Sequence, residues 1–421
     1  MSLPMTAFAE EVVEVAEVAT LDTGDTAWVL VSSALVLMMT LPGLALFYAG
    51  MVRKKNILST MMHSYGAAAV VSVLWVAAGY SLAFTDGGSA NAFVGGLSNA
   101  MLSGISLDAV SGTIPEILVV IFQLTFAVIT VAILAGSLAE RIKFGSFLVF
   151  SAAWILLVYA PICHWVWGGG WLTGDALDFA GGTVVHINAG VGGLVLAYLL
   201  GKRRDYGKGN LAPYNLAMTL IGAGLVWVGW FGFNGGSALG ANGAAAMALV
   251  VTQVAAAVGA LAWLLCEYVV RGKASALGGA SGAIAGLVGI TPAAGFVDVT
   301  GALMIGILTA VGCFAMIEYG KKKLGVDDSL DAFGLHGVGG IIGAVLTGVF
   351  VSGQLYPDAA VNSVGTQLWL QIEGVLATVV YSGVMTFVIG YAIKKTMGLR
   401  VSNEDEYQGL DLAIHGEKIG D

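Results

Sequence analysis

Charged side chains are scarce in this chain. Only 11% of its 421 residues are charged, whereas 57% are hydrophobic. A soluble globular domain carries about 25% charged residues, so this chain has too few of them to cover a surface that faces water. Its three cysteines form neither a CxxC motif nor a disulfide framework. We interpret the thiols as inert and buried, and the chain as one that is embedded in lipid.

Basic residues are also few, and their positions predict the topology. The eighteen Lys and Arg residues fall into clusters at 53–55, 141–143, 202–208, 271–273, 321–323 and 394–418. Each stretch between clusters is long enough for two spans of about 20 residues and a turn, and the stretch before the first cluster has room for one span. Cytoplasmic loops carry the excess of Lys and Arg. We therefore predict an all-α membrane protein with eleven transmembrane helices, its N-terminus outside and its C-terminus inside.

The expected spans divide the chain into three regions. The spans are 28–52, 57–84, 115–138, 144–163, 183–201, 213–233, 243–270, 275–291, 299–320, 333–352 and 366–396. An acidic N-terminal segment, 1–27, precedes the membrane domain, 28–396, and contains Ala7-Phe8-Ala9, which is compatible with the remnant of a signal peptide. The cytoplasmic tail, 397–421, is too short to fold alone, and we expect it to pack on the cytoplasmic face or to bind a partner.

Two histidines, His186 and His336, lie in apolar, glycine-rich spans. An ionisable side chain inside a bilayer is costly and therefore marks a candidate functional site. The two lie in the fifth and tenth spans, which run in opposite directions, and a GVGG sequence follows each of them, at 190–193 and 337–340. This pattern predicts an inverted repeat of spans 1–5 and 6–10, with the eleventh span left over and a substrate path between the halves.

These histidines have two interpretations. They could be separate core imidazoles, each satisfied by backbone carbonyls. For a pair placed on both halves of an inverted repeat, a shared location is the simpler hypothesis. Neutral imidazole offers one donor and one acceptor, so a stacked pair would line an apolar pore that suits a small hydrogen-bonding species or a proton relay.

Aromatic residues gather near the expected outer ends of several spans. The outer segments also contain acids but no Lys or Arg, which favours cations near the mouth. Aromatic faces attract cations by about 0.5–2 kcal/mol each, so this region suits a small cation. An interfacial aromatic belt is the alternative, and it fits Trp165 and Trp171 better than Trp167, which precedes a GGG run.

Two aspartates lie just before the histidine spans. Asp178 is either part of a cation site or an N-cap of the fifth span, and we favour a cap that also sets the local field. Asp331 lies about one helical turn before His336. We expect it to cap the tenth span or to anchor its backbone.

Motifs for several other kinds of protein are absent from the sequence. It has no HExxH, no TVGYG filter, no Walker A loop and no arginine-rich voltage-sensing helix. Two histidines without a nearby third ligand make a poor catalytic metal site. We therefore expect no cofactor, no metal and no nucleic-acid partner, and a membrane pore rather than an enzyme or a simple ion channel.

Six segments resemble the ammonium transporter family (Amt/Mep/Rh), and in particular its prokaryotic Amt branch. They are PGLALFYAG (42–50), FQLTFAVIT (122–130), DFAGGTVVHINAG (178–190), GWFGFNGGSA (229–238), FGLHGVGG (333–340) and LDLAIHGE (410–417). The resemblance covers roughly residues 27–417. It implies eleven spans with the N-terminus outside, a homotrimer with one pore per subunit, and a PII-type protein as a candidate cytoplasmic regulator.

The resemblance also implies roles for residues near the outer mouth. Phe126, Trp167 and Ser237 match the site that recruits ammonium, and Asp178 matches the acid beneath that site. Phe126 and Phe233 match a stacked gate. The loop between Trp167 and Asp178 departs from the family's pattern because it is one residue shorter.

Deeper in the membrane, the resemblance implies a lined pore. His186 and His336 match the paired pore histidines, Trp230 matches a pore-lining aromatic, and Gln123 matches a nearby polar position. The implied function is ammonium transport at the cell (inner) membrane, in which NH4+ loses a proton and NH3 crosses. Whether the proton follows along the imidazoles stays open. The alternatives are an ammonium sensor or transceptor and a Rhesus-type neutral NH3/CO2 channel, which Trp167 and Ser237 disfavour.

Overall fold

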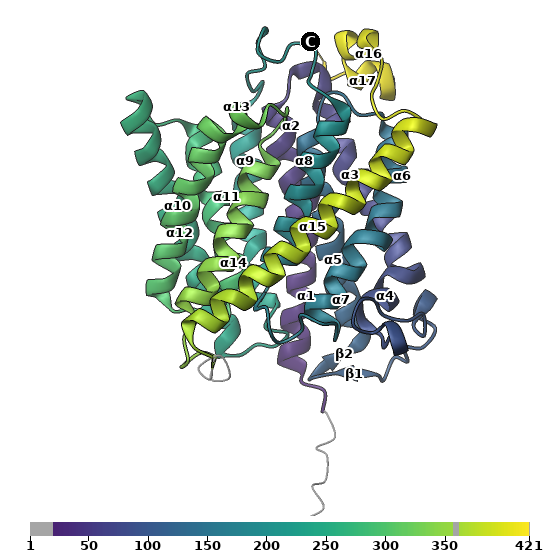
Figure 1. Cartoon of the computed structure of the whole chain (residues 1–421), viewed down its shortest axis with the longest axis vertical. Coiled ribbons are helices and arrows are strands. Elements are labelled where there is room, and N and C mark those ends of the chain that lie inside the picture. Colours follow the sequence, from purple (N-terminus) through teal and green to yellow (C-terminus); the bar gives the residue numbers. More distant parts are fainter. Residues whose placement is uncertain (1–19, 357–361, 421) are drawn as a thin grey trace, which may run out of the picture.

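A computed structural model of the chain, drawn in Figure 1, describes residues 20–356 and 362–420. Within these residues, eleven helical stretches are long and apolar enough to cross a membrane. They are Thr23–Met51, Lys54–Phe84, Glu116–Leu138, Phe144–Trp167, Gly182–Leu200, Leu216–Gly235, Gly243–Arg271, Ala276–Ala293, Val299–Leu324, Phe333–Phe350 and Val364–Thr396. The predicted all-helical membrane fold is therefore confirmed. The expected signal-peptide remnant lies outside the described residues.

Several spans are built from more than one helical segment. The α-helices are α1 (Thr23–Met38), α2 (Ala45–Met51), α3 (Ile57–Leu74), α4 (Tyr80–Phe84), α5 (Glu116–Ala135), α6 (Phe144–Trp154), α7 (Ala160–Trp167), α8 (Asn188–Leu200), α9 (Leu216–Trp230), α10 (Gly243–Arg271), α11 (Ala276–Ile290), α12 (Val299–Ala315), α13 (Lys321–Leu324), α14 (Val338–Phe350), α15 (Val364–Thr396), α16 (Asn403–Gln408) and α17 (Leu410–His415). The strands β1 (Val110–Ser111) and β2 (Ile114–Pro115) form an antiparallel hairpin with Val110 opposite Pro115.

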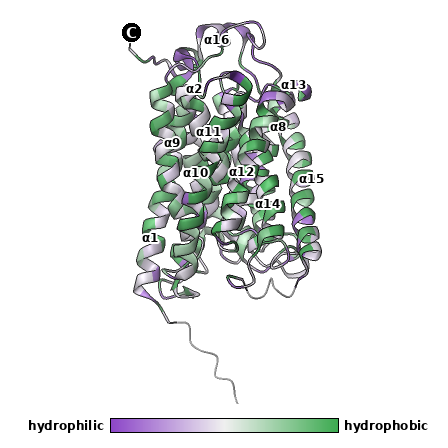
Figure 2. Cartoon of the chain, turned by 90° about the vertical axis from the view of Figure 1, so that its left-hand side faces the viewer, coloured by the Kyte–Doolittle hydropathy of each residue, from purple (hydrophilic) through white to green (hydrophobic). Residues whose placement is uncertain are grey.

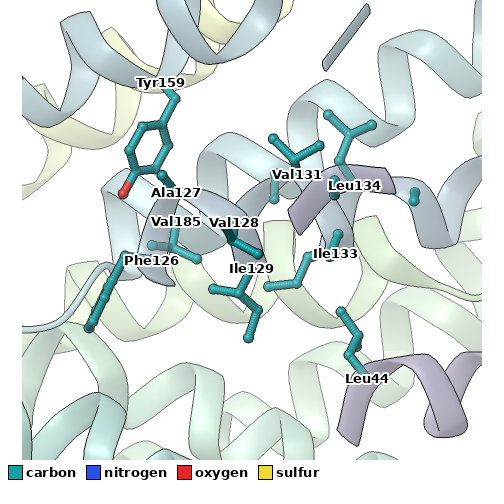
Figure 3. Close-up of a cluster of buried hydrophobic side chains, with 14 of the residues drawn as sticks. Leu44, Phe126, Ala127, Val128, Ile129, Val131, Ile133, Leu134, Tyr159 and Val185 are labelled. Atoms are coloured by element: carbon teal, nitrogen blue, oxygen red, sulfur yellow. The ribbon is translucent and has the colours of Figure 1, made fainter. Parts of the chain in front are cut away.

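The third span, α5, forms the centre of the bundle. Nearly all of its side chains from Leu118 onward are buried. Figure 3 shows Phe126, Ile129 and Ile133 among the residues that pack in one apolar cluster with Leu44 from α1–α2 and Tyr159 from the α6–α7 span. Lipid tails are as apolar as these side chains, so the close fit of the helices stabilises the bundle more than burial does.

Glycines allow the two histidine spans to cross closely. A Cβ atom on Gly190 would lie 2.3 Å from the backbone nitrogen of Gly337, and one on Gly340 would lie 2.8 Å from the carbonyl oxygen of Gly182. Only glycine fits at such distances. The two GVGG segments therefore bring the fifth and tenth spans into backbone contact.

The polar parts of the chain gather at the two ends of the bundle. Figure 2 shows hydrophobic residues along the spans and hydrophilic residues at both ends. We call the end that carries α16 and α17 the tail end, and the end that carries β1 and β2 the hairpin end. Figure 1 places the start of α1 at the hairpin end and α16 at the tail end, as an odd number of crossings requires.

The tail packs on the bundle, which is one of its two expected outcomes. The Asp411 carboxylate accepts hydrogen bonds from the amides of Leu58 and Ser59 at 3.1 and 2.7 Å, at the start of α3. The buried Glu406 carboxylate accepts the backbone N–H of Arg204 at 2.7 Å, in the loop that follows α8. These contacts join α16 and α17 to the tail end of the membrane domain.

Candidate functional site

A continuous column of rings runs from the hairpin end into the core. Trp167 meets Phe126 edge-on, with ring centroids 6.1 Å apart. Phe126 stacks on Phe233 at 4.2 Å and 18°, Phe233 lies 5.9 Å from His186, and His186 stacks on His336 at 5.2 Å. Residues from five separate spans thus meet in one line.

The two histidines contact each other directly. Their Nδ1 atoms lie 3.2 Å apart, and both side chains are buried. One imidazole must donate and the other accept in this contact, so at most one of the two Nδ1 atoms accepts. Within the described residues, Nε2 of His186 has no hydrogen-bond partner. A small hydrogen-bonding solute would satisfy this buried nitrogen.

Trp230 fixes the orientation of His186 from the side. The two rings stack with centroids 5.3 Å apart and planes 27° apart. The indole Nε1–H of Trp230 donates to Oγ1 of Thr291 at 2.9 Å. Sequence reasoning predicted Trp230 as pore-lining but missed Thr291, whose only sequence signal was a hydroxyl at the end of an apolar span.

Each histidine lies in a short π-helix that an aspartate caps. His186 lies in Gly182–Ile187 and His336 in Phe333–Gly337. Asp178 accepts four backbone N–H groups, those of residues 181 to 184, at 2.7–3.1 Å. The unpaired N–H groups of a helix start favour such a negative charge. The predicted capping by Asp178 therefore agrees with the geometry.

The cap of the tenth span is Asp328, so the expectation for Asp331 was wrong. Asp328 accepts backbone N–H groups of Ala332, Phe333 and Gly334 at 2.9–3.4 Å. Asp331 has a φ of 58°, and its carboxylate pairs with Nζ of Lys321 at 2.5 Å instead. The missed signal was spacing, because both caps lie eight residues before a histidine.

At the hairpin end, Trp167 is held in place by its neighbours. Its indole Nε1–H donates to the carbonyl oxygen of Asp178 at 2.8 Å. His164, which follows the expected end of the fourth span at residue 163, lies with Trp167 in α7. Both ring nitrogens of His164 lie within 2.9 Å of carbonyl oxygens, those of Ala83 and Asn91. These contacts tie α7 to α4 and to the loop that follows it.

Ser237 is joined to the column through Phe233. Its hydroxyl donates to the carbonyl oxygen of Phe233 at 2.8 Å. Because the hydroxyl proton is used, the remaining lone pairs of Oγ can accept from a donor on a substrate. Ser237 therefore suits a group that donates hydrogen bonds.

Two further polar residues, Gln123 and His63, make none of the ring contacts of the column. Gln123 is half-buried on α5, one turn before Phe126, and its Oε1 has no hydrogen-bond partner within the described part of the chain. Its predicted place near the pore stays a prediction. His63 was overlooked in the sequence, although it is also a buried histidine in a span. Its ring packs on Phe147 at 4.7 Å, outside the column.

A cavity of about 180 Å³ lies on the tail-end side of His336. Its lining includes Leu335, Asp331, Ser281 and Met51. Leu335 and Asp331 lie one and five residues before His336. Its wall thus reaches the residue next to His336, although neither histidine lines it.

The charges at the two ends of the column differ in sign and in pairing. All eighteen Lys and Arg residues belong to the clusters that lie at the tail end, and the segments 85–114 and 164–181 at the hairpin end contain none. At the tail end, Arg203 pairs with both Glu140 and Asp327 at 3.1 and 2.9 Å. The hairpin end therefore offers an anionic mouth without a basic partner of its own.

Comparisons with known proteins agree with this geometry. The model of the Ammonium Transporter Family matches residues 27–419. The chain is 50% identical over 409 residues to an ammonium transporter of Aquifex aeolicus, with 95% of this chain and 94% of the relative covered. It is also 50% identical to an ammonium transporter of Bacillus subtilis, with 94% and 98% covered.

Two solved structures have the same fold. Candida albicans Mep2 is 36% identical, with a TM-score of 0.85 and 92% of this chain and 88% of that chain covered. A protein described as Sensor Amt Protein is 28% identical, with a TM-score of 0.86 and 93% and 98% covered.

Proposed function

Because this chain belongs to the ammonium transporter family and is a multi-pass membrane protein that transports ammonium, we propose that its column of rings is the substrate path. The contact between His186 and His336 at the base of the stacked rings carries this proposal. An ionisable side chain inside a membrane span marks a candidate functional site, and here two of them are in direct contact.

Recruitment takes place at Trp167, Phe126 and Ser237. The ring faces attract NH4+, and Oγ of Ser237 accepts one of its N–H bonds. Asp178 lies beneath this site, since its carbonyl oxygen holds Trp167 and its carboxylate holds the start of the fifth span. The negative charge of Asp178 stabilises a cation at the mouth without binding it directly.

Passage requires that the substrate give up its charge. Phe126 and Phe233 close the path above the histidines with a 4.2 Å stack, and a bare cation beyond them would lose its hydration without compensation. NH4+ therefore releases a proton to solvent water at the mouth before the gate opens, and NH3 passes His186 and His336. Hydrated K+ and Na+ have no proton to release, so the apolar lumen rejects them.

The orientation and the partners follow from charge and from the family. The basic tail end faces the cytoplasm by the positive-inside rule, which puts the N-terminus outside and the cation site on the outer face. We infer a homotrimer in the cell (inner) membrane, a PII-type regulator at the tail end, and no catalysed reaction.

The sensor alternative has one specific observation in its favour, namely the fold shared with Sensor Amt Protein. A sensor without flux would not rescue growth of a transporter-deficient strain on limiting ammonium. Growth complementation therefore separates the two functions.

The role of the histidine pair can be tested by removing it. In proteoliposomes carrying His186→Ala with His336→Ala, we expect the ammonium-evoked current to fall and the selectivity for ammonium over K+ to be lost. Solid-supported-membrane electrophysiology measures both, and also reports whether charge moves. An unchanged current with unchanged selectivity would show that the pair has no role in transport.

The chain provides a matched control in His63. This histidine is also buried in a span, but it packs on Phe144 and Phe147 rather than on the ring column. His63→Ala should leave selectivity intact. If it abolished selectivity as the double variant does, the effect would be one of folding rather than of the pore.

A further inference from the structure

A groove opens between α8 and α15 on the outside of the bundle. It has a volume of about 450 Å³, and its lining includes Leu194, Tyr198, Gly383, Val384, Phe387 and Val388. Tyr198 is 66% exposed and Val384 is 57% exposed. In a membrane-spanning bundle, such exposed apolar side chains face lipid.

The groove exists because of how the two helices meet. Figure 1 shows α15 crossing diagonally over α8, and Gly383 lies on α15 within the groove. A Cβ atom at Gly383 would meet only Cγ1 of Val191, at 3.6 Å. The missing side chain at Gly383 therefore leaves a hollow, where a larger residue would fill it.

Lysine side chains lie on the tail-end side of this groove. Phe387, Tyr391 and Lys395 follow one another at intervals of four residues along α15 and so share one face of the helix. The rings of Phe387 and Tyr391 stack at 5.8 Å and 10°, and Nζ of Lys395 lies 5.3 Å from the ring centroid of Tyr391. An apolar row thus leads from the groove to an exposed ammonium.

A second ammonium joins the two helices at the same level. Nζ of Lys394 donates to the carbonyl oxygen of Leu199 at 2.7 Å, one residue beyond Tyr198 of the groove. An ammonium has three donors, so Lys394 keeps two for a ligand. Lys394 and Lys395 together place two positive charges beside the groove.

We infer that this groove holds one acyl chain of an anionic phospholipid, with its phosphate bound by Lys394 and Lys395. A purely apolar occupant would leave the two ammonium groups unused, and a zwitterionic lipid would gain less from them because it has no net charge. Basic residues at the cytoplasmic surface attract anionic lipids. Charge complementarity thus selects the lipid class, and the groove selects its position.

Photocrosslinking in nanodiscs tests this site on the full chain. The probes are phosphatidylglycerol and phosphatidylcholine, each with a diazirine near the end of one acyl chain, and mass spectrometry locates the crosslinks. We expect phosphatidylglycerol to label the segments 194–198 and 383–388 several-fold more than phosphatidylcholine does. Equal labelling by the two lipids would overturn the inference, as would a chain-to-chain crosslink that shows a second copy in the groove.

Two variants separate the groove from the charge. Gly383→Leu fills the hollow and should reduce labelling by phosphatidylglycerol several-fold. Lys395→Gln leaves the groove open and should bring the labelling by phosphatidylglycerol down toward that by phosphatidylcholine. If Lys395→Gln left the preference for phosphatidylglycerol unchanged, the proposed headgroup contact would be wrong even if Gly383→Leu failed to fold.

Gly145 offers a matched control. It is an exposed glycine in the first turn of α6, also at the tail end, and a Cβ atom there meets nothing within 4 Å. Gly145→Leu adds the same bulk on another face and should leave the labelling unchanged. A loss equal to that in Gly383→Leu would show a general effect on lipid packing and would overturn the assignment. Ammonium flux in each variant checks that the protein is folded.

Discussion

Asp178 lies eight residues before His186, and Asp328 lies eight residues before His336. Both carboxylates accept the backbone N–H groups of a π-helix that carries the histidine. The two segments come from opposite halves of the inverted repeat and meet at the imidazoles. In both halves, the capped segment thus has the same structural role, which is to hold an imidazole in the core.

The surroundings of the two aspartates are different. Asp328 lies among cations, since Lys321 and Arg141 both interact with it electrostatically, and it also accepts the hydroxyl of Ser137 at 2.7 Å. The segment around Asp178 contains no basic residue. A capping charge that has no cation of its own is free to stabilise a cationic substrate. Under the proposed function, one scaffold thus serves recruitment at one end and structure alone at the other.

Removing either cap should give the largest effect, and this effect should be alike in the two halves. Asp178→Ala and Asp328→Ala each leave several buried N–H groups unpaired, and unpaired groups cost about 1–3 kcal/mol each. We expect both variants to lose at least about 3 kcal/mol of stability, measured as a lower midpoint of thermal unfolding. Equal stability with wild type in either variant would contradict the capping role.

The milder Asn variants sharpen the comparison. An Asn side chain keeps one oxygen for the amides but removes the charge. Asp178→Asn should raise the ammonium concentration for half-maximal current by about tenfold or more, equivalent to ~1.4 kcal/mol, because the mouth loses the negative charge of its cap. Asp328→Asn should leave that concentration unchanged. Equal shifts in both variants would show that the recruiting charge does not lie at Asp178.

The tail end should depend on pH through its paired carboxylates. Burial raises the pKa of Glu140, but its hydrogen bonds and charge pairs with Arg53 and Arg203 outweigh burial and hold the pKa below the ordinary value of 4.5. A lowered pKa means that these pairs stabilise the fold above about pH 4.5 and that this stability is lost as the pH falls through the lowered pKa.

Glu140→Gln should remove this dependence. Breaking a buried ion pair leaves uncompensated charge and costs about 3–5 kcal/mol, so we expect a lower unfolding midpoint near neutral pH and a flatter acid profile. Thermal unfolding from neutral to acid pH measures both. Glu404→Gln, at an exposed position of α16, is the control. If its acid profile were as flat as that of Glu140→Gln, the Glu140 pairs would be ruled out as the cause.

Much of this fold could be predicted from two simple patterns. Basic clusters and apolar lengths located all eleven spans, because a bilayer forces each span to satisfy its backbone internally. The pairing of His186 with His336 could be predicted from their places in opposite halves. The stacking of Phe126 on Phe233 was available only from the family resemblance, since no periodicity reports which spans face each other.

The errors have local physical causes. Asp328 and Asp331 are both carboxylates within two turns of His336, and composition does not say which one receives the amides. The left-handed φ of 58° at Asp331 directs its side chain to Lys321. The fourth span was expected to end at residue 163, but its helix continues to Trp167, and there the ring nitrogens of His164 contact the carbonyl oxygens of Ala83 and Asn91.

A smaller effect is expected from Trp167, which is the aromatic part of the anionic mouth. Trp167→Leu keeps the apolar bulk but loses the cation–π contact, about 0.5–2 kcal/mol, and the hydrogen bond to Asp178. We expect the half-maximal ammonium concentration to rise by up to about tenfold, with maximal current less affected. Trp171→Leu removes a neighbouring indole outside the column and should change little. Equal effects of the two substitutions would favour an interfacial aromatic belt.

The smallest effect should come from Ser237, which contributes one neutral acceptor. Its hydroxyl already donates to the carbonyl oxygen of Phe233, so Ser237→Ala removes a single contact to the substrate, worth about 1 kcal/mol. We expect a rise of about fivefold in the half-maximal ammonium concentration and no change in maximal current. Ser151→Ala, which removes a hydroxyl with the same kind of bond to the carbonyl of Phe147, should change neither. If Ser237→Ala lowered the maximal current instead, its hydroxyl would act on passage through the gate, and recruitment at the hairpin end would rest on Trp167, Phe126 and the charge of Asp178 alone.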